Sequence, residues 1–253
     1  MLKEKLIRNV TEIGNGAHIF APREWLNSQV IIIRVSKVNP KEQIIKLITP
    51  YLDKIIGVFL YGSYARGDEE KTSDIDVFII SSEKFKIKSE NVEFIIIPEN
   101  KLELAKKINP VLYYSMLSEA KPIINSKYLA NLIKENPKLN EFNEFIRETK
   151  TLIKLNKTEI EISKDEKYAP NSAIYSLVLR LRGLFLINLL LKKQKYSRRK
   201  FKKFIEENSS LEFEKVYNIY SSVKEERKIK EKLTIEEAKA LLKIVEKLID
   251  KLK

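Results

Sequence analysis

Apolar and polar positions follow different patterns along the chain, which predict strands first, a mixed region next and helices last. Residues 58–61 form an apolar run typical of a buried strand, Gly62-Ser63 end that strand, and residues 64–73 after it form a polar segment. Residues 74–80 and 91–97 are two further apolar runs of strand length. A helix is predicted over residues 41–52, because isoleucines and a leucine recur there on one helical stripe.

The first 38 residues are predicted to form a separate small β module. Two short strands, over residues 8–13 and 17–20, flank a Gly-Asn-Gly turn. The proline that opens residues 22–26 favours a single helical turn, and residues 29–35 predict a third strand.

Beyond residue 128 the pattern becomes helical and amphipathic. Helices are predicted over residues 140–162, 173–191, 198–207, 211–224 and 234–252. Apolar side chains nearly encircle the helix over residues 173–191, so we expect it at the core of a bundle. The predicted fold class is therefore α+β. It comprises a small β element over residues 1–38, an α/β domain with a mixed sheet over 39–128, and a helical domain over 129–253.

Two carboxylates stand close together at the start of the second apolar run. Asp74 and Asp76 are separated by one residue, so in a strand they point to the same face. Two such carboxylates repel each other, and burying an unpaired charge is costly. A divalent cation would remove this cost, and Mg²⁺ takes one or two carboxylates while it leaves positions open for phosphates. The pair therefore predicts a metal site.

Glu93 is the third candidate carboxylate. It lies between Val92 and Phe94 in an apolar strand, so it presents the opposite face from both neighbours. A metal-binding or general-base role and a merely structural role on a sheet edge both remain open at this point.

The motifs around these carboxylates occur in a specific order. Gly62-Ser63, then Ala65-Arg66-Gly67, then Ser73-Asp74-Ile75-Asp76 resemble the signature of the DNA polymerase beta-like nucleotidyltransferase superfamily. The fuller string GSYARGDEEKTSDID is similar to the minimal nucleotidyltransferases of this superfamily, including those that act as antitoxins. The motifs cover only residues 57–97, so the rest of the chain has to be interpreted on its own pattern.

This resemblance implies a function for each motif. Asp74, Asp76 and Glu93 would be the catalytic residues and would hold two Mg²⁺ ions, although the superfamily more often has Asp at the third position. Gly62 and Ser63 would contact the triphosphate of ATP or another nucleoside triphosphate through backbone N–H groups and the serine hydroxyl. Arg66 would either bind phosphate or hold the motif loop in place.

The amino-terminal module has a resemblance of its own. The order GNGAHIFAPREW…VIIIRV resembles AbrB-like β modules, which commonly bind DNA as intertwined dimers. A hairpin that packs on the catalytic domain is the structural alternative. We interpret Trp25 and His18 as core or turn residues.

Composition narrows the remaining possibilities. With no cysteine and with His18 as the one histidine, disulfides, thiol nucleophiles and Cys-ligated zinc are excluded. Residues 1–10 lack the apolar core of a signal peptide, and residues 184–191 are too short to span a membrane. We therefore expect a cytoplasmic protein that has no membrane partner.

The formal net charge of +13 favours anionic partners. A dense basic cluster with two interleaved aromatic residues follows the predicted core helix. It comprises Lys192, Lys193, Lys195, Tyr196, Arg198, Arg199, Lys200, Phe201, Lys202 and Lys203. Contact with a triphosphate, contact with a nucleic-acid backbone and a solvated surface are the three interpretations of this cluster.

Two functions follow. The first is a Mg²⁺-dependent nucleotidyltransferase that moves a nucleoside monophosphate, AMP from ATP in the first instance, onto a hydroxyl group and releases pyrophosphate. The acceptor is left open between a protein, RNA and a small molecule. The alternative is a DNA-binding regulatory protein that uses the amino-terminal module, as a homodimer, with the nucleotidyltransferase fold as a nucleotide sensor.

Overall fold

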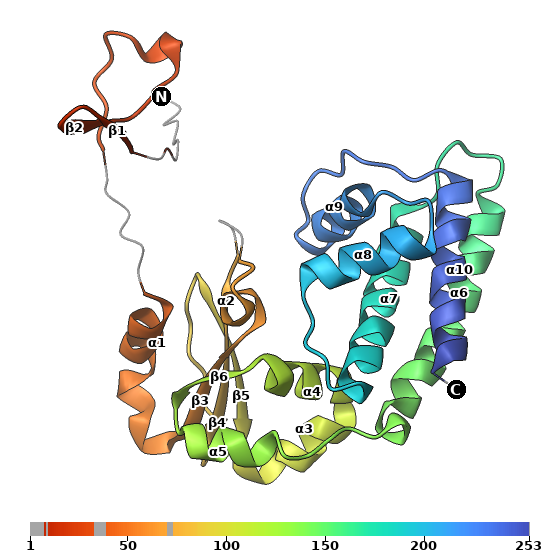
Figure 1. The fold of residues 1–253 in the computed structure, drawn as a ribbon, viewed down its shortest axis with the longest axis horizontal. Helices are drawn as coiled ribbons and strands as arrows, with labels where there is room; N and C mark the ends of the chain where they lie inside the picture. Colours follow the sequence, from red (N-terminus) through yellow and green to blue (C-terminus); the bar gives the residue numbers. More distant parts are fainter. Residues whose placement is uncertain (1–7, 9, 33–38, 70–72, 253) are drawn as a thin grey trace. The chain divides into compact units, whose positions relative to one another are not determined.

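The computed structural model describes residues 8, 10–32, 39–69 and 73–252. Contacts between Cα atoms divide the chain into two units, Met1–Val38 and Asn39–Lys253. Figure 1 labels the helices and strands of both units.

The first unit contains one small antiparallel hairpin. Its strands are β1 (Thr11–Ile13) and β2 (Gly16–His18), followed by the 3₁₀ turn η1 (Arg23–Trp25). The strand predicted over residues 29–35 is wrong for residues 29–32, and the others lie outside the described residues. Ile31 is 91% exposed, which fits the physical reason: a strand needs a partner, and the described part of this unit offers none.

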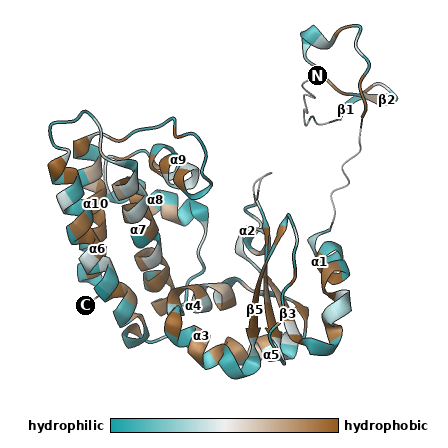
Figure 2. Cartoon of the chain, turned by 180° about the vertical axis from the view of Figure 1, so that it is seen from behind, coloured by the Kyte–Doolittle hydropathy of each residue, from teal (hydrophilic) through white to brown (hydrophobic). Residues whose placement is uncertain are grey.

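The second unit is built on a four-stranded sheet in the order β5-β4-β3-β6. The strands are β3 (Ile55–Tyr61), β4 (Ile75–Ser81), β5 (Val92–Pro98) and β6 (Lys121–Ile124). β3 pairs antiparallel with β4 and β6, whereas β4 and β5 are parallel, so the predicted mixed sheet is confirmed. β3 and β5 are strongly apolar in Figure 2, as expected for strands that pack on both faces.

Helices pack on both faces of this sheet. α1 (Pro40–Ile48) covers the face that presents Val58, Leu60, Val77 and Ile79. The side chain of Asn39 caps α1 by accepting the Lys41 N–H at 3.1 Å. The helix predicted over 41–52 ends earlier than expected, at Ile48, and continues as the 3₁₀ helix η2 (Thr49–Lys54), which contains Pro50.

Short helices follow the sheet strands. They are α2 (Gly62–Arg66), η3 (Glu99–Lys101), α3 (Leu102–Ile108), α4 (Pro110–Glu119), α5 (Ser126–Leu132) and η4 (Leu139–Phe142). The second face of the sheet, with Phe59, Tyr61, Phe78 and Ile80, shares its core with α3 and α4.

The helical half begins with α6. Its elements are α6 (Asn143–Ile162), α7 (Asn171–Leu191), α8 (Arg198–Asn208), α9 (Phe213–Lys224) and α10 (Ile235–Lys251). One continuous core runs from the sheet through α4 into α7, so the two halves form one unit. Thr234 and Glu237 form the capping box of α10: the Thr234 N–H donates to Glu237 at 2.7 Å, and the Glu237 N–H donates back at 3.2 Å.

α7 lies at the centre of the helical half, as predicted. It packs against α6, α9 and α10, and eleven of its residues between Ala173 and Leu190 are buried, whereas Leu179 is exposed. Within the described chain it is the one helix long and apolar enough to cross a membrane by length and composition, and 56% of its apolar window is buried inside the structure. This burial explains its composition through packing in the protein core.

Candidate active site

The three candidate carboxylates come from neighbouring parallel strands. Asp76 lies in β4 directly opposite Glu93 in β5, and Tyr61 of β3 lies opposite Asp76 on its other side. Asp74 stands just before β4. Because side chains alternate along strands, Asp74, Asp76 and Glu93 all point to the sheet face that carries Phe78. The two Asp residues and Glu93 are therefore brought to one face of the sheet.

Asp76 is the electrostatic centre of this group. Its pKa is raised to about 6, chiefly by burial, next by the Glu93 carboxylate and to a smaller extent by Asp74. Lys224 of α9 and Arg66 of α2 act in the opposite direction. Asp74 and Glu93 are exposed, whereas Asp76 is half-buried. The site therefore holds a carboxylate whose ionised form is not fully compensated by the protein.

The fit to a metal ion depends on how many carboxylates meet. Among the described residues, no group of three His, Cys, Asp or Glu side chains is close enough to hold a metal ion. The three candidate carboxylates therefore do not form such a group, and their joint binding of Mg²⁺ stays a prediction. Mg²⁺ normally takes only one or two carboxylates and keeps several waters, so Asp76 with Asp74 or Glu93 is a donor set that fits it.

Gly62 allows the Asp76 carboxylate to lie where it does. Its φ angle is 72°, which L side chains rarely adopt. A Cβ atom at this position would lie 2.0 Å from Oδ2 of Asp76. Gly67, which ends α2 with a φ of 79°, has open space where its Cβ would be. Gly62 is thus required by a close approach as well as by its backbone conformation.

Arg66 is engaged by carboxylates of its own chain. Its Nε donates to both oxygens of Asp68, at 3.1 and 3.2 Å, and its Nη1 donates to Glu119 at 2.6 Å. Its guanidinium also lies over the ring of Tyr196, 5.3 Å from the centroid. Burial raises the pKa of Glu119, and Arg66 partly offsets that rise. Arg66 therefore ties the motif loop to α4 and to the segment before α8, while a phosphate contact by Arg66 stays a prediction.

Several contacts in this neighbourhood could not be predicted from the sequence. The guanidinium of Arg182 in α7 also lies over the ring of Tyr196, 5.5 Å from its centroid. The backbone N–H of Arg198 donates to Asp68 at 3.4 Å. Glu119 and Lys224 had no signal, because each is an ordinary charged residue outside any motif, and Asp68 lies within the motif string with no role assigned to it. Only the fold brings them to the β3–β4 end of the sheet.

The basic cluster of residues 192–203 is largely paired or solvated. Arg198 pairs with Glu214 at 3.1 Å, and Lys202 pairs with the same carboxylate at 3.2 Å. Lys203 pairs with Glu207 one helical turn further on. The interleaved Tyr196 and Phe201 are buried, so both are core residues. The two cations that lower the pKa of Asp76, Lys224 and Arg66, both lie outside the predicted cluster.

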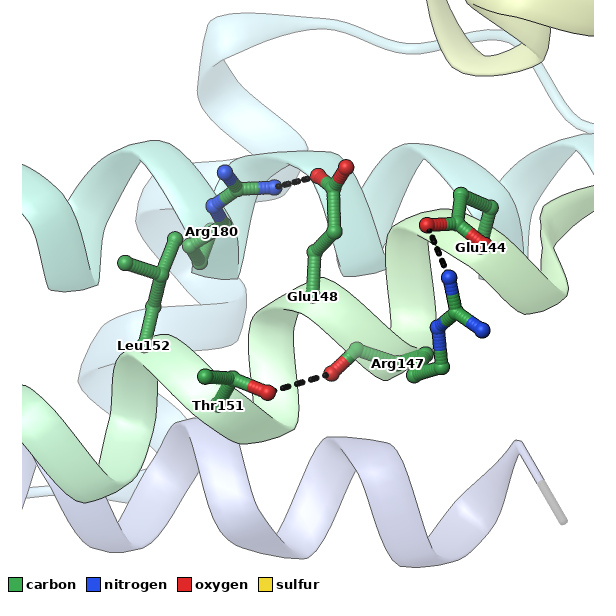
Figure 3. A pocket seen from close by; sticks show the side chains of 6 residues that line it. All are labelled: Glu144, Arg147, Glu148, Thr151, Leu152 and Arg180. Carbon is green, nitrogen blue, oxygen red and sulfur yellow. Dashed lines mark hydrogen bonds and ion pairs between the residues drawn. The ribbon is translucent and has the colours of Figure 1, made fainter.

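Two hollows in this unit differ in their relation to the carboxylates. One has a volume of about 580 Å³, and its lining includes Asp74 and Glu93. Another, of about 570 Å³, lies between α6 and α7 and contains none of the predicted site residues (Figure 3). Its charges pair with each other, Arg180 with Glu148 at 3.4 Å and Arg147 with Glu144 at 2.6 Å. Only the first hollow belongs to the candidate site.

Comparisons with known proteins identify the domain that contains these residues. A family model described as nucleotidyltransferase domain matches residues 42–167. A putative protein adenylyltransferase from Methanocaldococcus jannaschii is 38% identical over 61 residues, which are 24% of this chain and 62% of that relative. The match thus spans less than two thirds of the relative's length.

Two solved structures share weak overall similarity with the chain. One is a nucleotidyltransferase-like protein from Exiguobacterium sibiricum, with 13% identity, a TM-score of 0.38 and coverage of 84% of this chain and 75% of its own. The other is a spectinomycin adenyltransferase from Enterococcus faecialis, with 14% identity, a TM-score of 0.42 and coverage of 84% and 98%. The family match, which includes the motifs at Gly62, Asp74 and Asp76, shows that residues 42–167 of the chain are a nucleotidyltransferase domain.

Proposed function

We propose that the protein transfers a nucleoside monophosphate, AMP from ATP in the first instance, to a hydroxyl group of an acceptor. The observation that carries this proposal is the half-buried Asp76 opposite Glu93, directly against Gly62 at the start of the motif helix. The raised pKa of about 6 means that the ionised Asp76 carboxylate destabilises the folded protein. Groups with pKa values perturbed in this way cluster at functional sites. The name of the Methanocaldococcus relative, an adenylyltransferase, supports AMP as the transferred group.

In this mechanism the bond changes are simple. The acceptor oxygen forms a bond to the α-phosphorus of the nucleotide while the bond from that phosphorus to the bridging oxygen breaks, and pyrophosphate leaves. The proton of the hydroxyl passes to Glu93, which is exposed and can act as general base, or to solvent. Asp76, together with Asp74 or Glu93, would hold Mg²⁺, which would stabilise the attacking and leaving oxygens.

The other residues bind and position the nucleotide. Ser63, half-buried beside Gly62, can donate its hydroxyl to a phosphate oxygen. Lys224 provides positive charge on the side of Asp76 that faces α9. Arg66 holds the motif loop through Asp68 and Glu119. The chain thus surrounds the reacting phosphate with groups of fixed orientation.

A labelling experiment tests this function. The full chain is incubated with each α-³²P-labelled nucleoside triphosphate, Mg²⁺ and a cell extract, and the labelled species is identified by its sensitivity to protease and to ribonuclease. The Asp74→Asn/Asp76→Asn variant should give no label. Glu69→Gln is the matched control, because Glu69 is an exposed carboxylate of the same motif loop. Equal labelling by the double variant would refute the proposal.

The DNA-binding alternative depends on the first unit. Its described part is a hairpin followed by a 3₁₀ turn, with no buried residue among those described. DNA binding and a homodimer therefore stay predictions. A comparison of DNA affinity between the full chain and a chain that lacks residues 1–38 would test them.

A further inference from the structure

The strand that carries Glu93 lies at an open edge of the sheet. β5 pairs with β4 on one side, and no other strand of the described chain pairs with its outer side. The Asn91 carbonyl accepts the Ile75 N–H at 3.0 Å, which fixes the alternation along the strand. Val92, Phe94 and Ile96 therefore present their N–H and C=O groups to the open edge. Pro98, which has no N–H, occupies the next position of this kind.

The hollow beside the carboxylates and a further hollow, distinct from the one between α6 and α7, both border β5. The hollow of about 580 Å³ beside the carboxylates includes Val92, Glu93 and Phe94 in its lining. A second hollow, of about 450 Å³, includes Ile96 and Pro98. Their β5 residues follow one another from Val92 to Pro98, so surface space accompanies the open edge along the strand. An extended chain of several residues has room on this side.

The charges of the two hollows indicate what kind of chain fits. The lining of the hollow beside the site is negative overall, because it includes one cation, Lys88, and three carboxylates. The carboxylates are those of Asp74, Glu90 and Glu93. The second contains Lys84 and Lys101 against Glu83. A polyphosphate backbone would meet the excess of negative charge next to the site. A polypeptide offers the backbone N–H and C=O groups that an open strand edge needs.

We infer that the open edge of β5 binds the acceptor as an extended polypeptide, which adds as a strand beside Glu93 and presents a Ser, Thr or Tyr hydroxyl to the site. This inference rests on the proposed function, since it names the acceptor class of that reaction. Main-chain hydrogen bonds supply affinity in this mode of recognition, and alternate side chains supply specificity. The residue opposite Glu93 points to the same face as Glu93, which puts its hydroxyl beside the carboxylates. Basic residues suit the neighbourhood of the hydroxyl, and acidic residues suit the Lys84–Lys101 end.

Defined peptides provide the probe. Nonapeptides carry one central Tyr, Ser or Thr, lysines on one side, aspartates on the other and valines elsewhere. A second set has the charged ends exchanged, so that either strand direction is represented. Each is incubated with the full chain, Mg²⁺ and α-³²P-labelled ATP, next to an oligoadenylate with a free 3′ hydroxyl. Peptides from one of the two sets should take up label, and the oligoadenylate should not.

Backbone methylation separates strand addition from simple proximity. N-methylation of alternate residues removes either the amides that face β5 or the amides that face away from it. The first peptide should lose label by about tenfold or more, because several main-chain hydrogen bonds are lost, whereas the second should retain it. Equal labelling of the two methylated peptides, or label on the oligoadenylate alone, would overturn the inference.

Protein variants provide the second comparison. Glu90→Lys should lower kcat/KM for the lysine-bearing peptide about fivefold and leave ATP affinity unchanged. Lys121→Glu, at β6 on the opposite edge of the same sheet, should change neither. If wild type binds Mg²⁺ and ATP but labels no peptide, the edge inference fails alone. If wild type shows no Mg²⁺-dependent ATP binding, the proposed function fails with it.

Discussion

The charged residues on the two sides of Asp76 differ in their pairing and in their exposure to solvent. On the α2 side, Arg66 is fixed between Asp68 and Glu119, and Tyr196 lies under its guanidinium. On the β5 side, Glu93 and Asp74 are exposed. The α2 side is thus an ordered network that can hold a nucleotide in one orientation. The β5 side is open to solvent, as the entry side for a second substrate should be.

This comparison also separates structural from chemical charges. The Arg66–Glu119 pair is well buried, with side-chain exposures of 17% and 7%, so removing one partner leaves an uncompensated charge. Asp76 is the opposite case, because burial and the neighbouring carboxylates disfavour its ionised form more than the nearby cations stabilise it. The pair stabilises the fold, whereas the lone carboxylate destabilises it and marks the site of chemistry. Four variants can break or sharpen this distinction.

The largest effect is expected from Gly62→Ala. The new Cβ would overlap Oδ2 of Asp76, so the carboxylate must move, and a displacement of this size typically costs about 100-fold in rate. Gly67→Ala is the control, because it has a similar φ but nothing within 4 Å of the new Cβ. It should cost only about 1 kcal/mol of stability. Transfer rates and urea unfolding of both variants are the measurements, and equal losses of activity would contradict the close-approach argument.

Glu119→Ala should weaken the fold on the α2 side. It leaves the buried Arg66 with Asp68 alone, and we expect the free energy of unfolding to fall by roughly 2–3 kcal/mol. Glu144→Ala breaks the exposed pair with Arg147 in Figure 3 and should change stability by less than about 0.5 kcal/mol. Urea denaturation measures both. Similar values for the two variants would mean that the Arg66 network does not hold the fold.

Asp76 predicts a pH dependence of stability in the absence of metal. Its pKa is about 6 in the folded chain and 3.8 as its ordinary value, so the folded state binds the proton more tightly. The free energy of unfolding should therefore fall as pH rises from about 4 to about 6, and it should stay low above that range. After solvent screening the contribution is on the order of 1–2 kcal/mol. Asp76→Asn should be more stable than wild type at pH 7 with EDTA present, and a flat difference between pH 4 and 7 would contradict this.

The smallest effect concerns the cations. Lys224→Gln should weaken binding of ATP with Mg²⁺ about tenfold, because this charge acts directly at Asp76. Lys203→Gln is the control within the basic cluster, since Lys203 is exposed and pairs with Glu207. It should leave ATP affinity nearly unchanged. Calorimetric titration measures the ATP affinity of both variants. A larger loss of affinity for Lys203→Gln would mean that the basic cluster, and not Lys224, contacts the nucleotide.

The sequence predicted the local parts of the site well. The strands around Gly62 and Asp76 follow from apolar runs, and the partnership of Asp76 with Glu93 follows once β4 and β5 are neighbours. These features depend on residues close in sequence or on strand periodicity. For the same reason the core position of α7 was predictable from its apolar circumference.

The remaining parts depend on tertiary packing. Glu119 lies 53 residues from Arg66, and their hydrogen bond has no trace in either local pattern. Lys224 looks like any helix-ending lysine, whereas three cations of the conspicuous cluster, Arg198, Lys202 and Lys203, pair with Glu214 or Glu207. Charge density along a sequence does not show which carboxylates folding brings next to each cation, so it could not predict these pairs or the effect of Lys224 on Asp76.

Two positions of the label in ATP test the central claim most directly. The full chain is incubated with Mg²⁺, the cell extract as the source of acceptor, and ATP labelled at either the α- or the γ-phosphate. If Asp74 and Asp76 support nucleotidyl transfer, the α-label should become attached to the acceptor and the γ-label should appear in pyrophosphate. The Asp74→Asn/Asp76→Asn variant should neither attach the α-label to the acceptor nor release the γ-label in pyrophosphate. The control variant Glu69→Gln should give both products. Attachment of the γ-label, or undiminished transfer of the α-label by the double variant, would contradict the account.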